Sequence, residues 1–188
     1  TTATKQYPND YRAYNNLAVL AYQQGDLATA KSYLDKAEAI DGKSAEVNAN
    51  KALVALAEGK NAEAKDYLMK ATASPNYNEV LGNLQVAAGN YAQAAQCLKG
   101  VNSNSAALAQ LLNKDYAEAS KTLGKVARPD ATTSYLKAIV AARSGQDSSV
   151  LSNLKDAFAK DSSLKQRAAK DLEFATLFND ATFQSLVK

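Results

Sequence analysis

The side chains that most often carry out catalysis are nearly absent from this sequence of 188 residues. It has no histidine, the commonest general base and metal ligand, and its one cysteine, Cys97, excludes an internal disulfide. The carboxylates are scattered, and Asp115 and Glu118 lie at a predicted helix start, where negative charge favours the helix dipole. No glycine-rich phosphate-binding loop occurs. The sequence therefore predicts a protein that is not an enzyme and that holds neither a cofactor nor a metal ion.

Composition and charge exclude two further classes of function. Hydrophobic residues make up 46% of the chain, which is enough for a buried core, and the net charge is only +3. Proteins that bind nucleic acid usually gather basic residues on one face, and no such cluster occurs here. No run of 18 apolar residues is present to span a bilayer. We therefore expect neither nucleic-acid binding nor direct membrane insertion.

What the sequence does carry is a repeated pattern of glycine, alanine and leucine. Gly25, Gly59, Gly89 and Gly145 are each followed five residues later by Ala or Val and nine residues later by Leu. Lys114 takes the place of glycine in a degraded copy. Glycine suits the left-handed end of a helix, and the spacing of the apolar residues is that of one helical face. Each copy therefore predicts a turn between two helices.

The first copy shows how two such helices would be placed. In the first helix Tyr14, Leu17, Ala18 and Ala21 are spaced by three and four residues, which places them on one helical face. Gly25 then ends that helix, and Asp26 caps the next one. The inner stripe of the second helix consists of Leu27, Ala30, Leu34 and Ala37. The small side chains of Ala18 and Ala30 should allow the two helices to approach closely.

This pattern resembles the tetratricopeptide repeat, in which an aromatic-x2-Leu-small-x2-Tyr segment, a Gly-centred turn and an Ala-x3-aromatic/Leu-x2-Ala segment follow one another. The resemblance implies an all-α fold, an α-α superhelix in which antiparallel helix pairs form a right-handed solenoid. It covers residues 11–160 in about five pairs: 11–44, 45–74, 75–101, a degenerate 102–130, and 131–160. Because the repeat spacing is shortest around the fourth unit, we expect a short first helix near 105–113 and irregular packing there.

Both ends of the chain carry their own signals. Residues 1–10 resemble the close of a preceding repeat, which predicts a fragment of a longer bacterial protein. Residues 161–188 contain Asp-x2-Phe-x2-Leu twice, starting at Asp171 and at Asp180. This pattern predicts short capping helices over the last helix pair, and a peptide-docking motif is the alternative.

In tetratricopeptide arrays the first helix of each unit lines a concave groove that takes an extended peptide or a helix. Carried over to this chain, the resemblance implies the groove residues Arg12, Asn15, Asn16, Val19, Tyr22, Glu46, Asn50, Leu53, Asn76, Glu79, Asn83, Tyr135, Ile139 and Arg143. Asn16, Asn50 and Asn83 lie where the family often carries asparagine, whose amide both donates and accepts hydrogen bonds and can bind a peptide backbone. Alternatively, these amides only satisfy neighbouring helices or water.

The resemblance thus predicts a non-catalytic interaction module or scaffold that binds a protein or peptide segment. The alternative is a structural spacer or self-association segment within a longer cell-envelope protein. The oligomeric state is left open, and a monomer is compatible with the sequence. The many Tyr, Asn, Gln and Lys residues, together with the tail pattern, favour the bacterial cell envelope or periplasm, with the cytoplasm as the other compartment.

Overall fold

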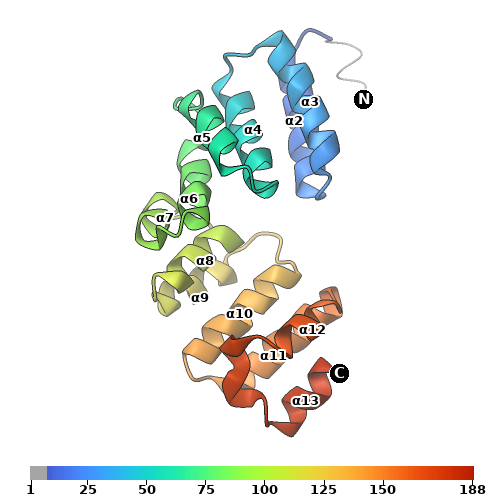
Figure 1. Ribbon diagram of the computed structural model, residues 1–188, viewed down its shortest axis with the longest axis vertical. Helices are drawn as coiled ribbons and strands as arrows, with labels where there is room; N and C mark the ends of the chain where they lie inside the picture. The colour runs from blue at the N-terminus through green and yellow to red at the C-terminus, as the bar shows by residue number, and fades with distance from the viewer. Residues whose placement is uncertain (1–7) are drawn as a thin grey trace. The chain divides into compact units, whose positions relative to one another are not determined.

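The computed structural model describes residues 8–188, and within this range every regular element is a helix. Residues 1–7 of the predicted repeat remnant at 1–10 lie outside the described residues. The chain forms two compact units, of which unit 1 ends at Cys97 and unit 2 runs from Leu98 to Lys188 (Figure 1). The predicted all-α fold of successive helix pairs is confirmed. The repeat boundaries drawn from the sequence stay predictions.

Unit 1 consists of stacked helix pairs. The pairs are α2 (Tyr11–Gln23) with α3 (Leu27–Ile40), α4 (Ala45–Ala57) with α5 (Asn61–Met69), and α6 (Tyr77–Ala87) with α7 (Tyr91–Cys97). Helix α4 contacts both helices of the first pair, and α6 contacts both helices of the second (Figure 1). Since every first helix touches the first helix before it, α2, α4 and α6 form one continuous layer.

Unit 2 begins with two further pairs and ends in a group of short helices. The pairs are α8 (Asn104–Leu112) with α9 (Tyr116–Gly124) and α10 (Ala131–Arg143) with α11 (Asp147–Lys160). The short helices are α12 (Leu164–Ala168), the 3-10 helix η1 (Leu172–Leu177) and α13 (Ala181–Val187). The short helix expected near 105–113 is confirmed, because α8 has 9 residues whereas α2 has 13. Helix η1 contacts α10, and α13 contacts α11, so the tail caps the last pair.

The turn inside each helix pair has the same geometry in all five copies. Gly25 has φ 79°, and Lys114, the residue that replaces glycine, has φ 65°. The backbone N–H of the next residue closes the turn in both cases, from Asp26 to Ala21 O at 3.0 Å and from Asp115 to Gln110 O at 2.8 Å. The degraded copy therefore keeps its turn, although a side chain in this conformation costs roughly 1–2 kcal/mol.

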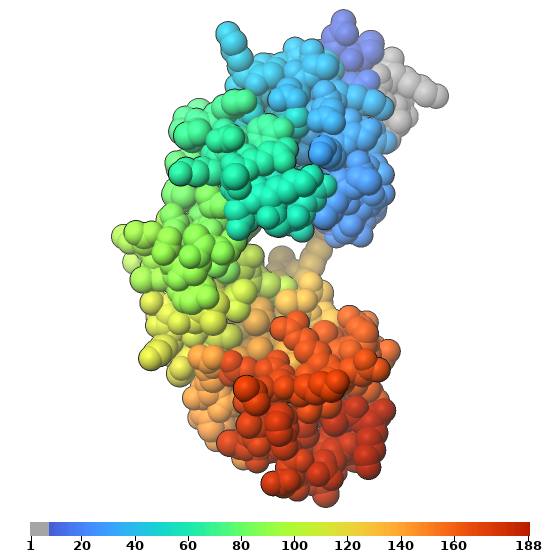
Figure 2. Space-filling view, in the orientation of Figure 1, coloured from blue at the N-terminus to red at the C-terminus, as the bar shows by residue number. Residues whose placement is uncertain are grey.

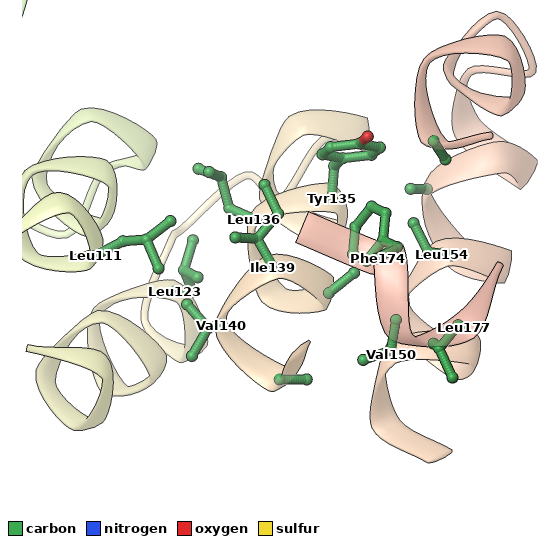
Figure 3. Packing of buried hydrophobic residues seen from close by; sticks show 14 of the residues in the cluster. Leu111, Leu123, Tyr135, Leu136, Ile139, Val140, Val150, Leu154, Phe174 and Leu177 are labelled. Carbon is green, nitrogen blue, oxygen red and sulfur yellow. The ribbon is translucent and has the colours of Figure 1, made fainter. Parts of the chain in front are cut away.

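The core differs between the two units. In unit 1 the helices meet through alanines, and both Ala18 and Ala30 are buried as expected. In unit 2 one cluster joins the two pairs to the tail through the buried rings of Phe158, Phe174 and Phe183. Figure 3 shows Leu111 and Leu123 on one side of α10, and Phe174 with Leu154 on the other. Helix α10 is thus enclosed between the preceding pair and the tail.

Candidate partner-binding groove

The first helices of unit 1 enclose a hollow of about 190 Å³. It is lined by Ala18, Val19, Tyr22, Gln23, Leu34, Asn50, Leu53, Val54, Asn76 and Glu79, which come from α2, α3, α4 and α6 or, for Asn76, from the residue before α6. Six of these are residues that the sequence assigned to a groove: Val19, Tyr22, Asn50, Leu53, Asn76 and Glu79. The structure therefore brings predicted residues from three consecutive repeats to one place.

The lining of this hollow combines apolar and polar side chains. Val19 and Leu53 are half-buried aliphatic side chains, and Asn50 lies beside them. The hydroxyl of Tyr22 is also half-buried, and burial together with the nearby charge of Glu79 raises its pKa. At neutral pH this hydroxyl is protonated and can donate a hydrogen bond. Glu79 is the one charged residue among those that line the hollow.

The asparagines predicted for the groove have different environments. Asn50 Nδ2 donates a hydrogen bond to Asn15 Oδ1 at 2.8 Å, which ties α4 to α2. This contact agrees with the alternative that an amide satisfies a neighbouring helix. Asn16 is exposed to solvent, whereas Asn83 is half-buried and its Oδ1 lacks a hydrogen-bond partner among the described residues. Asn16 and Asn50 each lie nine residues before their turn glycine, whereas Asn83 lies six residues before Gly89, and the three amides have different surroundings in the structure.

The first-turn residues of α2 and α4 are charged and exposed. Arg12 Nη2 lies 2.8 Å from Asp10 Oδ2, and Arg12 Nε also donates to Asp10, which caps α2. The hydrogen bonds from Arg12 lower the pKa of Asp10 and the same contact raises the pKa of Arg12. Glu46 is exposed in the first turn of α4. These charges lie outside the residues that line the hollow.

The groove residues predicted in unit 2 have contacts of another kind, because the tail of the chain covers them. The Tyr135 hydroxyl donates to Asp171 Oδ2 at 2.8 Å. The ring of Phe174 meets the Tyr135 ring edge-on (Figure 3), with centroids 5.6 Å apart and planes at 78°. The Arg167 guanidinium lies over the Tyr135 ring. Burial and the hydrogen bond to Asp171 raise the pKa of Tyr135.

Arg143, further along α10, is held by the tail in the same way. Arg143 donates from Nε and Nη2 to the two carboxylate oxygens of Glu173, at 2.8 and 2.5 Å. This paired contact raises the pKa of Arg143. Ile139 is only 8% exposed. Figure 2 shows the red C-terminal residues lying directly against the orange helices that precede them. The sequence predicted a cap but not that the cap would cover these groove residues; the only signal was the Asp171-x2-Phe174 spacing.

Comparison with known proteins identifies the repeats and the fold. The sequence profile of the tetratricopeptide repeat family matches residues 11–44 and 45–78. Residues 11–78 therefore contain two tetratricopeptide repeats. The resemblance predicted from the glycine and alanine spacing is thereby confirmed for this part of the chain, and the two matched repeats supply helices α2 to α5 of unit 1, together with the start of α6.

Two solved structures share the fold over nearly the whole chain. One is the crystal structure of PilW, described as a widely conserved type IV pilus biogenesis factor, with a TM-score of 0.58, 20% identity, and coverage of 95% of this chain and 87% of that one. The other is PilF of Pseudomonas aeruginosa, with a TM-score of 0.54, 20% identity, and coverage of 93% and 84%. At this identity the likeness shows a shared fold. A search among curated proteins gave no match.

The described repeats offer neither a metal site nor a membrane span. Residues 8–188 contain no group of three or more His, Cys, Asp or Glu side chains placed to hold a metal ion. In the same part of the chain, none of the helices combines the length and the apolar character that crossing a bilayer requires.

Proposed function

We propose that unit 1 is a non-catalytic binding module that takes an extended segment of another protein along α2, α4 and α6. The observation that carries this proposal is the hollow beside Val19, Tyr22 and Leu53, which is lined from three consecutive repeats. Tetratricopeptide repeats generally mediate interactions between proteins, and six of the groove residues implied by that family line this hollow.

The size of the hollow favours a side chain over a small molecule. Sites for small organic ligands usually measure roughly 300–1,000 Å³, whereas this hollow measures about 190 Å³. That volume accommodates one or two aliphatic or aromatic side chains of a bound segment. The rest of the segment would then lie over the exposed surface of the first helices.

The polar residues that line the hollow indicate how the backbone of the segment would be held. Asn50, Asn76 and the Tyr22 hydroxyl supply uncharged hydrogen-bonding groups, and Glu79 supplies one negative charge. A segment with an apolar side chain next to a backbone N–H or a basic residue fits this surface. Because one charge takes part, we expect the affinity to change little with salt concentration.

We infer that the partner segment belongs to a protein of the bacterial cell envelope. Support comes from PilW, which is described as a type IV pilus biogenesis factor and whose fold matches 95% of this chain. The fold supports an adaptor role within an assembly, in which this protein positions another chain without changing it chemically.

A selection from random peptides tests the proposal and needs no purified partner protein. Peptides displayed on phage would be selected on the folded chain, and the best one would be labelled and titrated by fluorescence anisotropy. The double substitution Val19→Gln and Leu53→Gln should weaken its binding about tenfold or more, because two apolar side chains that line the hollow are lost. Thermal unfolding followed by circular dichroism would show that the variant remains folded.

A matched control is available on the same helix as Val19. Leu20 is 54% exposed and does not line the hollow, so Leu20→Gln should leave peptide affinity unchanged. If the selected peptides bind the double variant as tightly as the parent chain, the groove of unit 1 is not the binding surface.

A further inference from the structure

A second and larger hollow, of about 880 Å³, lies within unit 2 between α9, α10 and α11. Its lining is mostly small and polar and consists of Lys114, Asp115, Tyr116, Ala117, Ser120, Gly124, Lys137, Val140, Ala141, Ser144, Gln146, Ser149 and Asn153. None of these residues belongs to the groove of unit 1, so this hollow is a separate surface.

Unit 1 has a hollow at the equivalent place, but there it is filled. Positions correspond when they are counted from the turn residues, so that Gly25 is matched with Lys114 and Gly59 with Gly145. On this count Lys31, Lys51, Val54, Ala55, Glu58, Glu63 and Tyr67 of unit 1 correspond to Ser120, Lys137, Val140, Ala141, Ser144, Ser149 and Asn153 of unit 2. The free volume in unit 1 is only about 10 Å³.

Each site contains a lysine at the corresponding position, Lys51 in unit 1 and Lys137 in unit 2, and the contacts of Lys51 show what fills the site in unit 1. In unit 1 the Lys51 ammonium is 3.0 Å from Asp35 Oδ1, also pairs with Glu38, and lies 5.1 Å from the centre of the Tyr67 ring. Lys51 is only 7% exposed. Burial opposes its charge, but the hydrogen bonds to Glu38 and Asp35 outweigh burial and raise its pKa. Two carboxylates and an aromatic ring thus satisfy this lysine.

Unit 2 keeps the lysine and lacks all three of its partners. By the same count Gly124 stands in place of Asp35, Ala127 in place of Glu38, and Asn153 in place of Tyr67. Helix α9 has 9 residues where α3 has 14, so it ends before the position that would carry the second carboxylate. Lys137 consequently forms no ion pair or side-chain hydrogen bond with any residue between 8 and 188.

The remaining charges leave the hollow open to an acidic ligand. Lys114 and Lys137 line it together with one carboxylate, Asp115, whose Oδ1 already accepts from the backbone N–H of Glu118 at 3.2 Å. The hydroxyls of three serines replace the longer charged side chains of unit 1, which leaves room for several incoming side chains. A free inorganic anion would occupy a small fraction of this volume.

We propose that the hollow beside Lys137 binds an acidic segment of a partner protein, which supplies the carboxylates and the ring that unit 1 provides from its own chain. The template is internal to the molecule: Asp35 and Glu38 are three residues apart on one helix and both reach the corresponding lysine. A helical segment with Asp-x2-Glu and a nearby aromatic residue matches that arrangement. The site is independent of the groove in unit 1.

The test uses a designed probe and the full chain. The probe is a fluorescein-labelled, alanine-based helical peptide of about 16 residues that carries Asp-x2-Glu and one Tyr on the same face. Its control is the same peptide with Asn and Gln in place of the two acids. We expect the acidic probe to bind, and its affinity to fall about tenfold in Lys137→Gln, which removes a charge-assisted contact. Lys155→Gln, an exposed position on α11 outside the hollow, should bind as the parent does.

A second variant would fill the hollow from within. Gly124→Asp combined with Asn153→Tyr restores one carboxylate and the ring, and a side chain at Gly124 has open space around its Cβ. This variant should no longer bind the acidic probe, and its thermal stability should equal that of the parent chain. The proposal would be overturned if the acidic probe bound Lys137→Gln or the filled variant as tightly as it binds the parent chain. It would also be overturned if the uncharged probe bound as tightly as the acidic one, or if the acidic probe did not bind at millimolar concentration. Displacement of the probe by inorganic phosphate alone, with no dependence on its carboxylate pair, would also overturn it and assign a small-anion site.

Discussion

The first helices of the repeats have one role in unit 1 and another in unit 2. In unit 1, α2 and α4 present Val19, Tyr22 and Leu53 to an open hollow. In unit 2, α10 presents Tyr135 and Arg143 to the tail of its own chain, through hydrogen bonds to Asp171 and Glu173. Corresponding faces of the first helices are therefore open in unit 1 and covered by the chain's own tail in unit 2.

The sites around Lys51 in unit 1 and Lys137 in unit 2 differ in the opposite sense. Around Lys51 unit 1 fills its hollow with carboxylates and a tyrosine ring, whereas around Lys137 unit 2 leaves about 880 Å³ open. A repeat fixes the backbone positions of these side chains and leaves their identities free to vary. The comparison indicates that, in such a fold, a surface can bind a partner only where the chain does not cover or fill it with its own residues.

The largest expected effect concerns the tail that covers α10. Phe174 is fully buried between Tyr135 and Phe183, so Phe174→Ala should lower the free energy of unfolding of unit 2 by about 3–5 kcal/mol. Urea denaturation followed by circular dichroism measures this loss. Leu172→Ala, in the same segment but at a position 80% exposed, should change stability by less than about 0.5 kcal/mol. Equal effects of the two substitutions would mean that the tail does not close unit 2.

A smaller effect should separate the two lysines. Lys51→Ala leaves Asp35 and Glu38 without their shared cation and removes a buried stem, which should cost about 1–3 kcal/mol. Lys137→Ala should cost less than about 0.5 kcal/mol, since no partner is lost. The same denaturation experiment compares them, and a larger cost at Lys137 would contradict the equivalence drawn between a filled and an open site.

The smallest effect concerns the turn that links α8 and α9. Lys114 adopts φ 65°, a conformation that glycine adopts without strain, so Lys114→Gly should raise the free energy of unfolding by about 1 kcal/mol. Gly25→Ala at the matching turn of unit 1 should lower it by a similar amount, although its Cβ would meet no atom within 4 Å. Two thermal unfolding curves measure both changes. If Lys114→Gly lowered the free energy of unfolding, the positive φ of Lys114 would not be a source of strain.

Much of the fold could be predicted from local patterns in the sequence. Gly25 and its counterparts indicated the turns, because only a few residue types tolerate positive φ. The shortened spacing between repeats around the fourth unit predicted the short helix α8. The groove of unit 1 could be predicted in part, since Val19, Tyr22 and Leu53 follow from helix periodicity together with the resemblance to tetratricopeptide repeats.

The rest depends on contacts between residues far apart in the chain. Asn50 bonds Asn15 across 35 positions, and Tyr135 bonds Asp171 across 36. No local period indicates which partner such a side chain will meet. The open site at Lys137 is of the same kind, because its volume depends on where α9 ends relative to α10 and α11.

The most direct test of the account is to locate the peptide selected on this chain by nuclear magnetic resonance. With uniformly ¹⁵N-labelled protein, titration of the peptide should shift backbone amide signals along α2, α4 and α6 and leave those of Tyr135 and Arg143, on the covered face of α10, unchanged. That result would show that the open face of unit 1 binds while the covered face of unit 2 does not. Shifts that gather on α10 and the C-terminal helices, with none on α2 or α4, would contradict it.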